Sequence, residues 1–220
     1  MIGPGTPLLL GSGSPRRREL LTSLGLPLIV AAVDVDEAGR EGEGAGAYLR
    51  RIVGSKLAAA TRLPEARGAG GVLVADTAVI LAGEVLQKPR DEAEARSMIR
   101  ALSGRDHEVC TRFAIAAGGR SRGEDGEDGG GAALHEETVS TRVRFRALDE
   151  EEIAGYAATG EGLDKAGAYA IQGIGAFAVA GIEGSWSNVV GLPVTEVIAA
   201  LRKTGLLERF PLPSLPSARS

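Results

Sequence analysis

Residues 8–24 contain the feature that most constrains the fold, a short strand that leads through a tight turn into a helix. Residues 8–10 are three leucines, an apolar run typical of a strand. Residues 11–14 are Gly-Ser-Gly-Ser, which favours a turn, and Pro15 suits the first turn of a helix because no N–H is needed there. Predicted strands and helices then alternate along most of the chain, as they do in α/β proteins.

The remaining elements are predicted from apolar periodicity and from the residues that interrupt it. The predicted strands cover residues 28–33, 72–75, 78–81, 84–86 and 139–145. The predicted helices cover residues 47–63, 91–104, 149–159 and 193–205. Two of these helices begin with a capping box, in which an aspartate is followed three residues later by a glutamate.

The chain is predicted to form one domain over residues 1–206, followed by a disordered tail at 207–220. Residues from Phe210 onward are rich in proline and serine, a composition that forms no packed core. Residues 118–131 are rich in glycine and charged side chains, and they predict a mobile hairpin tip.

Composition excludes several classes of protein. With 220 residues and 44% hydrophobic content, the chain can bury a sizeable core. Its net charge of −4 argues against a general nucleic-acid binder, because duplex affinity depends on many lysine and arginine contacts. The single cysteine, Cys110, excludes an internal disulfide framework. No apolar run reaches the length of a membrane helix, so we expect a cytoplasmic protein without a membrane partner.

Three consecutive arginines at the start of the first helix predict an anion site. Free N–H groups and the dipole at a helix N-terminus attract negative charge, and guanidinium groups match phosphate oxygens. Arg17 lies near the centre of the helix's leucine stripe and should face inward, Arg16 lies on its flank, and Arg18 should be solvated. The alternative is a surface charge run without a ligand.

Asp76 is the leading candidate for chemistry. It follows an apolar strand, and open α/β sheets bind ligands at the carboxyl ends of their strands. Lys88 follows soon after and offers a positive partner. Lys56 lies in a largely apolar helix, where its ammonium either points into a cleft or extends to the surface. The structural alternative for Asp76 is a turn cap beside Thr77.

Residues 164–173 combine small side chains with a few long polar ones. Such a segment allows the backbone to approach a ligand closely, and Gln172 could bind the edge of a base through its amide. A flexible loop is the alternative. His107 and His135 lack the spacing of a metal pair, and both are interpreted as structural.

Seven segments in order along residues 8–206 resemble the Maf family of nucleotide pyrophosphatases. They are Leu-Leu-Leu-Gly-Ser-Gly-Ser-Pro-Arg-Arg-Arg-Glu-Leu-Leu, Asp-Val-Asp-Glu, Val-Ala-Asp-Thr, Gln-Lys-Pro, Leu-Ser-Gly-Arg-Asp-His-Glu-Val, Leu-Asp-Lys-Ala-Gly-Ala-Tyr-Ala-Ile-Gln-Gly and Asn-Val-Val-Gly-Leu-Pro. The resemblance implies an α/β fold of the Maf and inosine triphosphate pyrophosphatase type. In that fold a mixed sheet and two lobes surround a cleft, and the protein is usually a homodimer.

The resemblance also implies a reaction, the hydrolysis of a nucleoside triphosphate to the monophosphate and pyrophosphate with a divalent cation, Mg²⁺ or Mn²⁺. Asp76 matches the catalytic acidic residue, proposed to accept a proton from the attacking water. Arg16, Thr77 and Gln172 match positions that select substrate in the branch acting on dTTP and UTP. The other matching pocket positions are Ser12, Arg17, Glu37, Lys56, Lys88 and Lys165. Glu37 with Asp76 could hold the metal.

Two other functions are consistent with the same family. A sister branch prefers 7-methyl-GTP, against which the set Arg16, Thr77 and Gln172 argues. A nucleotide-binding regulator of cell division without turnover is the second, and the retained Asp76 argues against it. A P-loop ATPase is excluded because Gly-x-x-x-x-Gly-Lys-[Ser/Thr] is absent from the sequence.

Overall fold

The computed structural model describes residues 1–119 and 132–212. Most of the predicted hairpin tip at 118–131 and the last eight residues of the predicted tail lie outside this range. Within it, no helix is long and apolar enough to cross a membrane.

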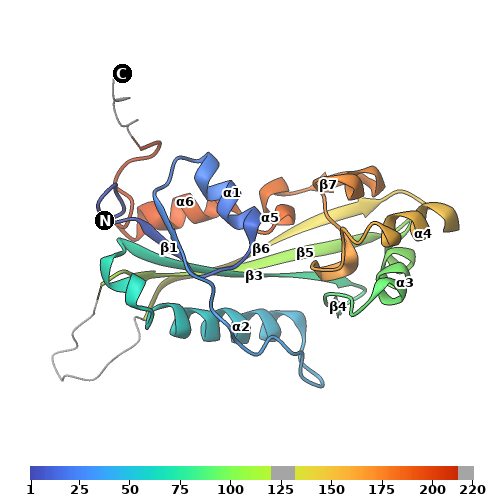
Figure 1. The fold of residues 1–220 in the computed structure, drawn as a ribbon, viewed down its shortest axis with the longest axis horizontal. Helices are drawn as coiled ribbons and strands as arrows, with labels where there is room; N and C mark the ends of the chain where they lie inside the picture. The colour runs from blue at the N-terminus through green and yellow to red at the C-terminus, as the bar shows by residue number, and fades with distance from the viewer. Residues whose placement is uncertain (120–131, 213–220) are drawn as a thin grey trace.

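A mixed seven-stranded sheet forms the centre of the fold, with strand order β2-β1-β3-β5-β6-β7 and β4 paired with β3 (Figure 1). Its strands are β1 (Leu8–Leu10), β2 (Leu28–Val30), β3 (Gly71–Leu81), β4 (Glu84–Leu86), β5 (Asp106–Ala117), β6 (Ala133–Phe145) and β7 (Val179–Glu183). β1 pairs in parallel with β2 and β3, whereas β3, β5, β6 and β7 are successively antiparallel.

The helices divide the molecule into two lobes. They are α1 (Pro15–Ser23), α2 (Ala45–Ala60), α3 (Glu92–Leu102), α4 (Glu150–Ala158), α5 (Trp186–Val190) and α6 (Val194–Lys203), with short 3-10 turns η1 (Pro64–Gly68), η2 (Ala166–Ala168) and η3 (Ile174–Ala178). α2 covers one face of the sheet, and α1 and α6 cover the other (Figure 1). α3 and α4 pack together at the end of the sheet away from α6 and form the second lobe. The predicted α/β fold with two lobes is therefore confirmed.

Alternation along β1 distributes the core to both faces of the sheet. Leu8 and Leu10 pack into one cluster with Leu201 of α6, while Leu9 packs into another with Val53 of α2. This is the expected result of successive strand residues pointing to opposite faces. The second lobe has its own apolar cluster, which includes residues of α3 and α4.

Asp76 lies in the middle of a strand, and the prediction that it follows a strand end is wrong. The apolar run ends at Ala75, but β3 continues to Leu81 because β5 pairs with it along nearly its whole length. On the other edge, β1 pairs with β3 over Gly71–Leu73 and β4 pairs over Val79–Leu81. On this edge, Asp76 therefore lies in the stretch of β3 after its pairing with β1 and before its pairing with β4.

Local signals place most of the other elements correctly. Asp149 and Glu152 form the predicted capping box. The Asp91 side chain caps α3, but the Glu94 carboxylate accepts from the backbone N–H of Arg90 and not from that of Asp91, so the second predicted box is wrong in this half. The sequence pattern predicts no element at β5, β7 or α5.

The packed chain extends beyond the predicted domain boundary. Leu207 is buried, and Phe210 and Leu212 pack against the same core cluster as α6. The predicted boundary at residue 206 is therefore too early by at least six residues. Composition does not indicate this, because the packing depends on an apolar surface formed by other parts of the chain.

Candidate active site

A cavity of about 360 Å³ opens between the two lobes, over the part of β3 that lies between its pairings with β1 and β4. Its wall is formed by the turn after β1, the start of α1, the centre of β3, the segment 164–172 and the end of α5. Its size is within the usual range for small-molecule sites. Every residue predicted for the site lines it: Ser12, Arg16, Arg17, Glu37, Lys56, Asp76, Thr77, Lys88, Lys165 and Gln172.

Two carboxylates and one ammonium meet at the floor of this cavity. Lys56 Nζ, on α2, lies 2.7 Å from Asp76 Oδ1 and 2.6 Å from Glu37 Oε1. Lys56 and Asp76 are only 7% and 8% exposed. Of the two orientations that the sequence allows for Lys56, the structure therefore shows the one in which the ammonium points into the cleft and not to the surface. In this position the ammonium holds both carboxylates in place.

Glu37 connects this buried cluster to solvent. Its other oxygen lies 3.5 Å from Nζ of the exposed Lys88. Partial burial favours the protonated form of Glu37, but the hydrogen bond from Lys56 and the charges of both lysines outweigh it and lower the pKa of Glu37 below its ordinary value. Glu37 is consequently charged at neutral pH.

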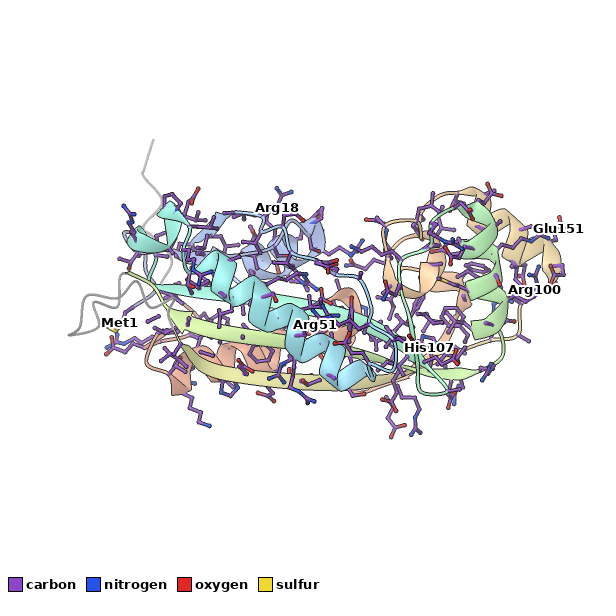
Figure 2. All side chains as sticks on the ribbon, turned by 90° about the horizontal axis from the view of Figure 1, so that it is seen from below. Met1, Arg18, Arg51, Arg100, His107 and Glu151 are labelled. Atoms are coloured by element: carbon purple, nitrogen blue, oxygen red, sulfur yellow. The ribbon has the colours of Figure 1, made fainter. Side chains whose placement is uncertain are left out.

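Arg17 faces inward, as helical periodicity predicts, whereas Arg18 projects into solvent (Figure 2). The guanidinium of Arg17 donates to Gly191 O at 2.8 Å, Ala75 O at 2.9 Å, Thr77 Oγ1 at 3.0 Å and Ser12 Oγ at 3.1 Å. Four of its five N–H groups are thus bound to protein. Burial lowers its pKa, partly offset by the charges of Asp76 and Glu37. Arg17 fastens α1, β3 and α5 together and contributes charge to the cavity.

The segment after α4 supplies the opposite wall. Lys165 Nζ donates to the backbone carbonyl of Glu161 and to the Asp164 carboxylate. Asp164 Oδ2 also lies 3.9 Å from Arg16 Nη1, so this segment contacts the arginine helix. Gln172 is exposed and lines the mouth of the cavity.

Asp164 and the carbonyl of Gly191 are site components that the sequence did not single out. Gly191 follows α5 with φ of 127°, a conformation that favours glycine, and its carbonyl accepts from Arg17. Asn188 holds α5 in place through hydrogen bonds to Val109 O and Thr141 Oγ1. Both Asn188 and Gly191 stand in a segment that carries the family resemblance, which was the available signal.

His107, labelled in Figure 2, is buried and does not line the cavity, in agreement with the structural role predicted for it. Its Nε2 lies 2.8 Å from Oη of Tyr169, which lines the cavity. Both rings pack edge-to-face with Phe145. Burial lowers the pKa of His107 to about 4 and outweighs the opposing charge of Asp106.

We expect the free energy of unfolding to decrease as the pH falls from 6.5 to about 4. In this range His107 is protonated in the unfolded chain and neutral in the folded one, so the unfolded state binds more protons. At the lower end of this range, the low pKa of His107 should reduce the free energy of unfolding by about 2–3 kcal/mol. Urea unfolding at pH 7 and pH 4.5 should show a smaller pH effect in His107→Gln than in the wild type. Equal pH effects would contradict this assignment.

An α/β fold whose cleft gathers basic side chains around two fixed carboxylates is typical of enzymes that act on phosphorylated ligands. Comparison with known proteins identifies the family more closely. Residues 7–204 match the family of Maf-like proteins, and the chain belongs to this family.

Several relatives are similar over nearly their whole length. A protein of Myxococcus xanthus (strain DK1622) named dTTP/UTP pyrophosphatase is 51% identical, with 94% of this chain and 95% of that protein covered. Proteins of the same name from Anaeromyxobacter sp. (strain Fw109-5) and Hahella chejuensis (strain KCTC 2396) are 49% and 42% identical, covering 94% and 90% of this chain and 91% and 92% of theirs. A solved nucleoside-triphosphatase / dITP/XTP pyrophosphatase of Mycobacterium abscessus has 13% identity and a TM-score of 0.34, with 93% of this chain and 99% of that chain covered, and this score is too low for an inference.

Proposed function

We propose that this chain hydrolyses dTTP and UTP to the nucleoside monophosphate and pyrophosphate. The observation that carries the proposal is the pairing of the buried Asp76 carboxylate with Lys56 at the floor of a cavity rimmed by basic residues. The names of the relatives at 42–51% identity support the substrate class.

The basic side chains around the cavity bind the triphosphate in this proposal. Arg16, Lys88 and Lys165 neutralise phosphate charge from three directions, since they belong to α1, to the segment after β4 and to the segment after α4. The buried charge of Arg17 adds to the same field. The N–H groups of Ser12 and Gly13 in the turn after β1, and those of the first turn of α1, offer further donors to phosphate oxygens, whereas those of Gly11 and Ser14 are bound to Leu73 O and Ser12 Oγ.

Asp76 accepts the proton of the attacking water. Lys56 binds only one of its carboxylate oxygens among the described residues, which leaves Oδ2 for a water molecule. Lys56 also keeps the carboxylate in one orientation, so the water is positioned before reaction. The product phosphates are stabilised by the same basic residues that bind the substrate.

Glu37 and Asp76 would hold a divalent cation, Mg²⁺ or Mn²⁺. The described residues contain no group of three or more His, Cys, Asp and Glu placed to bind a metal. Lys56 binds one oxygen of each carboxylate, and the second oxygens, Asp76 Oδ2 and Glu37 Oε2, fit Mg²⁺, which commonly binds one or two carboxylates together with substrate phosphates. Such an ion supplies charge neutralisation and lowers the pKa of bound water.

The reaction is tested by incubating the protein with Mg²⁺ or Mn²⁺ and a panel of triphosphates that includes dTTP, UTP, dCTP and 7-methyl-GTP. Pyrophosphate should appear as the first product, most rapidly from dTTP and UTP. Orthophosphate as the first product would refute the reaction class. A preference for 7-methyl-GTP would place the chain in the sister branch.

Gln172 selects the base in this proposal. We expect Gln172→Ala to change the order of substrate preference more than the maximal rate, because Gln172 is an exposed residue of the cavity whereas Asp76 is buried at its floor. The loss of one base contact should lower the discrimination between dTTP and dCTP about tenfold. An unchanged ratio of kcat/KM values would remove Gln172 from substrate selection.

We also propose a cytoplasmic homodimer, as the family resemblance implies. Exposed apolar side chains such as Phe177, Ile182 and Trp186 offer surface that a second copy could cover. Sedimentation velocity at micromolar concentration tests the dimer, and a monomer across that range would refute it.

A further inference from the structure

We propose that Glu161 is a positioning residue for substrate selection, because its carboxylate holds the turn from which Gln172 faces the cavity. The inference rests on the proposed function, in which Gln172 contacts the base. Glu161 does not line the cavity, so it acts through the backbone of the turn and never on the substrate.

The Glu161 carboxylate binds the chain immediately after Gln172. Its Oε1 accepts from the backbone N–H of Ile174 at 2.8 Å, and its Oε2 accepts from that of Gly175 at 2.8 Å. These bonds and that from Tyr156 outweigh the effect of burial and lower the pKa of Glu161, so it is charged at neutral pH. Hydrogen bonds to a charged acceptor are about twice as strong as neutral ones.

The chain immediately before Gln172 is bound through Tyr156. The hydroxyl of this tyrosine donates to Glu161 Oε2 at 2.9 Å and accepts from the backbone N–H of Ala170 at 3.2 Å. One tyrosine and glutamate pair therefore fixes the backbone on both sides of Gln172. Burial raises the pKa of Tyr156, so its hydroxyl keeps the proton that this arrangement needs.

Close backbone approach shows how tightly the turn packs on this pair. A Cβ atom added to Gly173 would lie 2.3 Å from Glu161 Oε1, and the φ of Gly173 is +80°. A Cβ atom on Gly175 would lie 2.5 Å from Tyr156 Oη and 2.4 Å from Ala170 O. Only glycine fits both positions, which means that the turn is built against the carboxylate.

The same glutamate also holds a cation of the cavity. Its backbone carbonyl accepts from Lys165, and the neighbouring Asp164 lies 3.9 Å from Arg16. The contact with Lys165 is made by the backbone carbonyl, so it does not depend on the carboxylate, whereas loss of the carboxylate contacts at Ile174 and Gly175 would shift the amide of Gln172 at the base.

The test compares Glu161→Gln with Gln172→Ala and with the double variant. Glutamine keeps the volume and one acceptor oxygen, but its NH2 group cannot accept from a backbone N–H. Pyrophosphate release gives kcat and KM for dTTP and dCTP. Glu151→Gln is the matched control, because Glu151 is an exposed glutamate on α4 outside the cavity.

We expect Glu161→Gln to raise the KM for dTTP and to lower the dTTP to dCTP ratio about tenfold, with kcat less affected. The double variant should resemble Gln172→Ala alone, because both changes remove the same base contact. The amides of Ile174 and Gly175 should also exchange hydrogen faster. Glu151→Gln should change none of these quantities.

An unchanged ratio, or effects that multiply in the double variant, would overturn the inference while the wild type still releases pyrophosphate from dTTP. If the wild type releases none, the proposed function fails, and the inference fails with it. If Glu161→Gln does not fold, Tyr156→Phe removes the hydroxyl from the same network and keeps the ring. A lower dTTP to dCTP ratio in this variant would then support the inference, and an unchanged ratio would overturn it.

Discussion

Asp76→Asn is expected to lower kcat for dTTP by about 10³-fold, as removal of a general base does, without unfolding the protein. Asparagine has nearly the same shape, but it can neither accept a proton from water nor contribute charge to a cation. Lys56 keeps its 2.6 Å contact with Glu37, so the buried ammonium still has a charged partner. The melting temperature should therefore stay within a few degrees of the wild-type value. Pyrophosphate release and circular dichroism measure the two quantities.

The matched control for this substitution is Asp34→Asn. Asp34 is an exposed aspartate three residues before Glu37, and it does not line the cavity. Its substitution should leave kcat within twofold of the wild type, as expected for a surface change. Activity of Asp76→Asn within tenfold of the wild type would remove this carboxylate from the chemistry.

Residues whose placement depends on local periodicity were the ones that the sequence predicted well. Arg17 faces inward and Arg18 outward because their positions relative to the leucine stripe fix their directions on any straight helix. The Asp149 cap is correct for the same reason, since its partners lie within one turn.

Features that depend on partner strands could not be predicted in this way. The length of β3 is set by β5, which comes 35 residues later in the chain from first residue to first residue. The direction of Lys56 is set by Asp76 and Glu37, which belong to other elements. Asp76 lines the cavity although the strand end assigned to it was wrong, because a carboxylate after an apolar run is unusual in either position.

Arg17→Met is expected to lower the free energy of unfolding by about 4 kcal/mol, since three buried acceptors and one partly buried acceptor would each lose a donor at about 1 kcal/mol or more. Methionine fills similar space but donates nothing to Gly191 O, Ala75 O or the two hydroxyl groups. Arg18→Met, on the exposed side of the same helix, should change the value by less than about 0.5 kcal/mol. Urea unfolding at pH 7 compares the two variants. A loss below about 1 kcal/mol in Arg17→Met would mean that water replaces the guanidinium at these acceptors, and Arg17 would then serve the substrate alone.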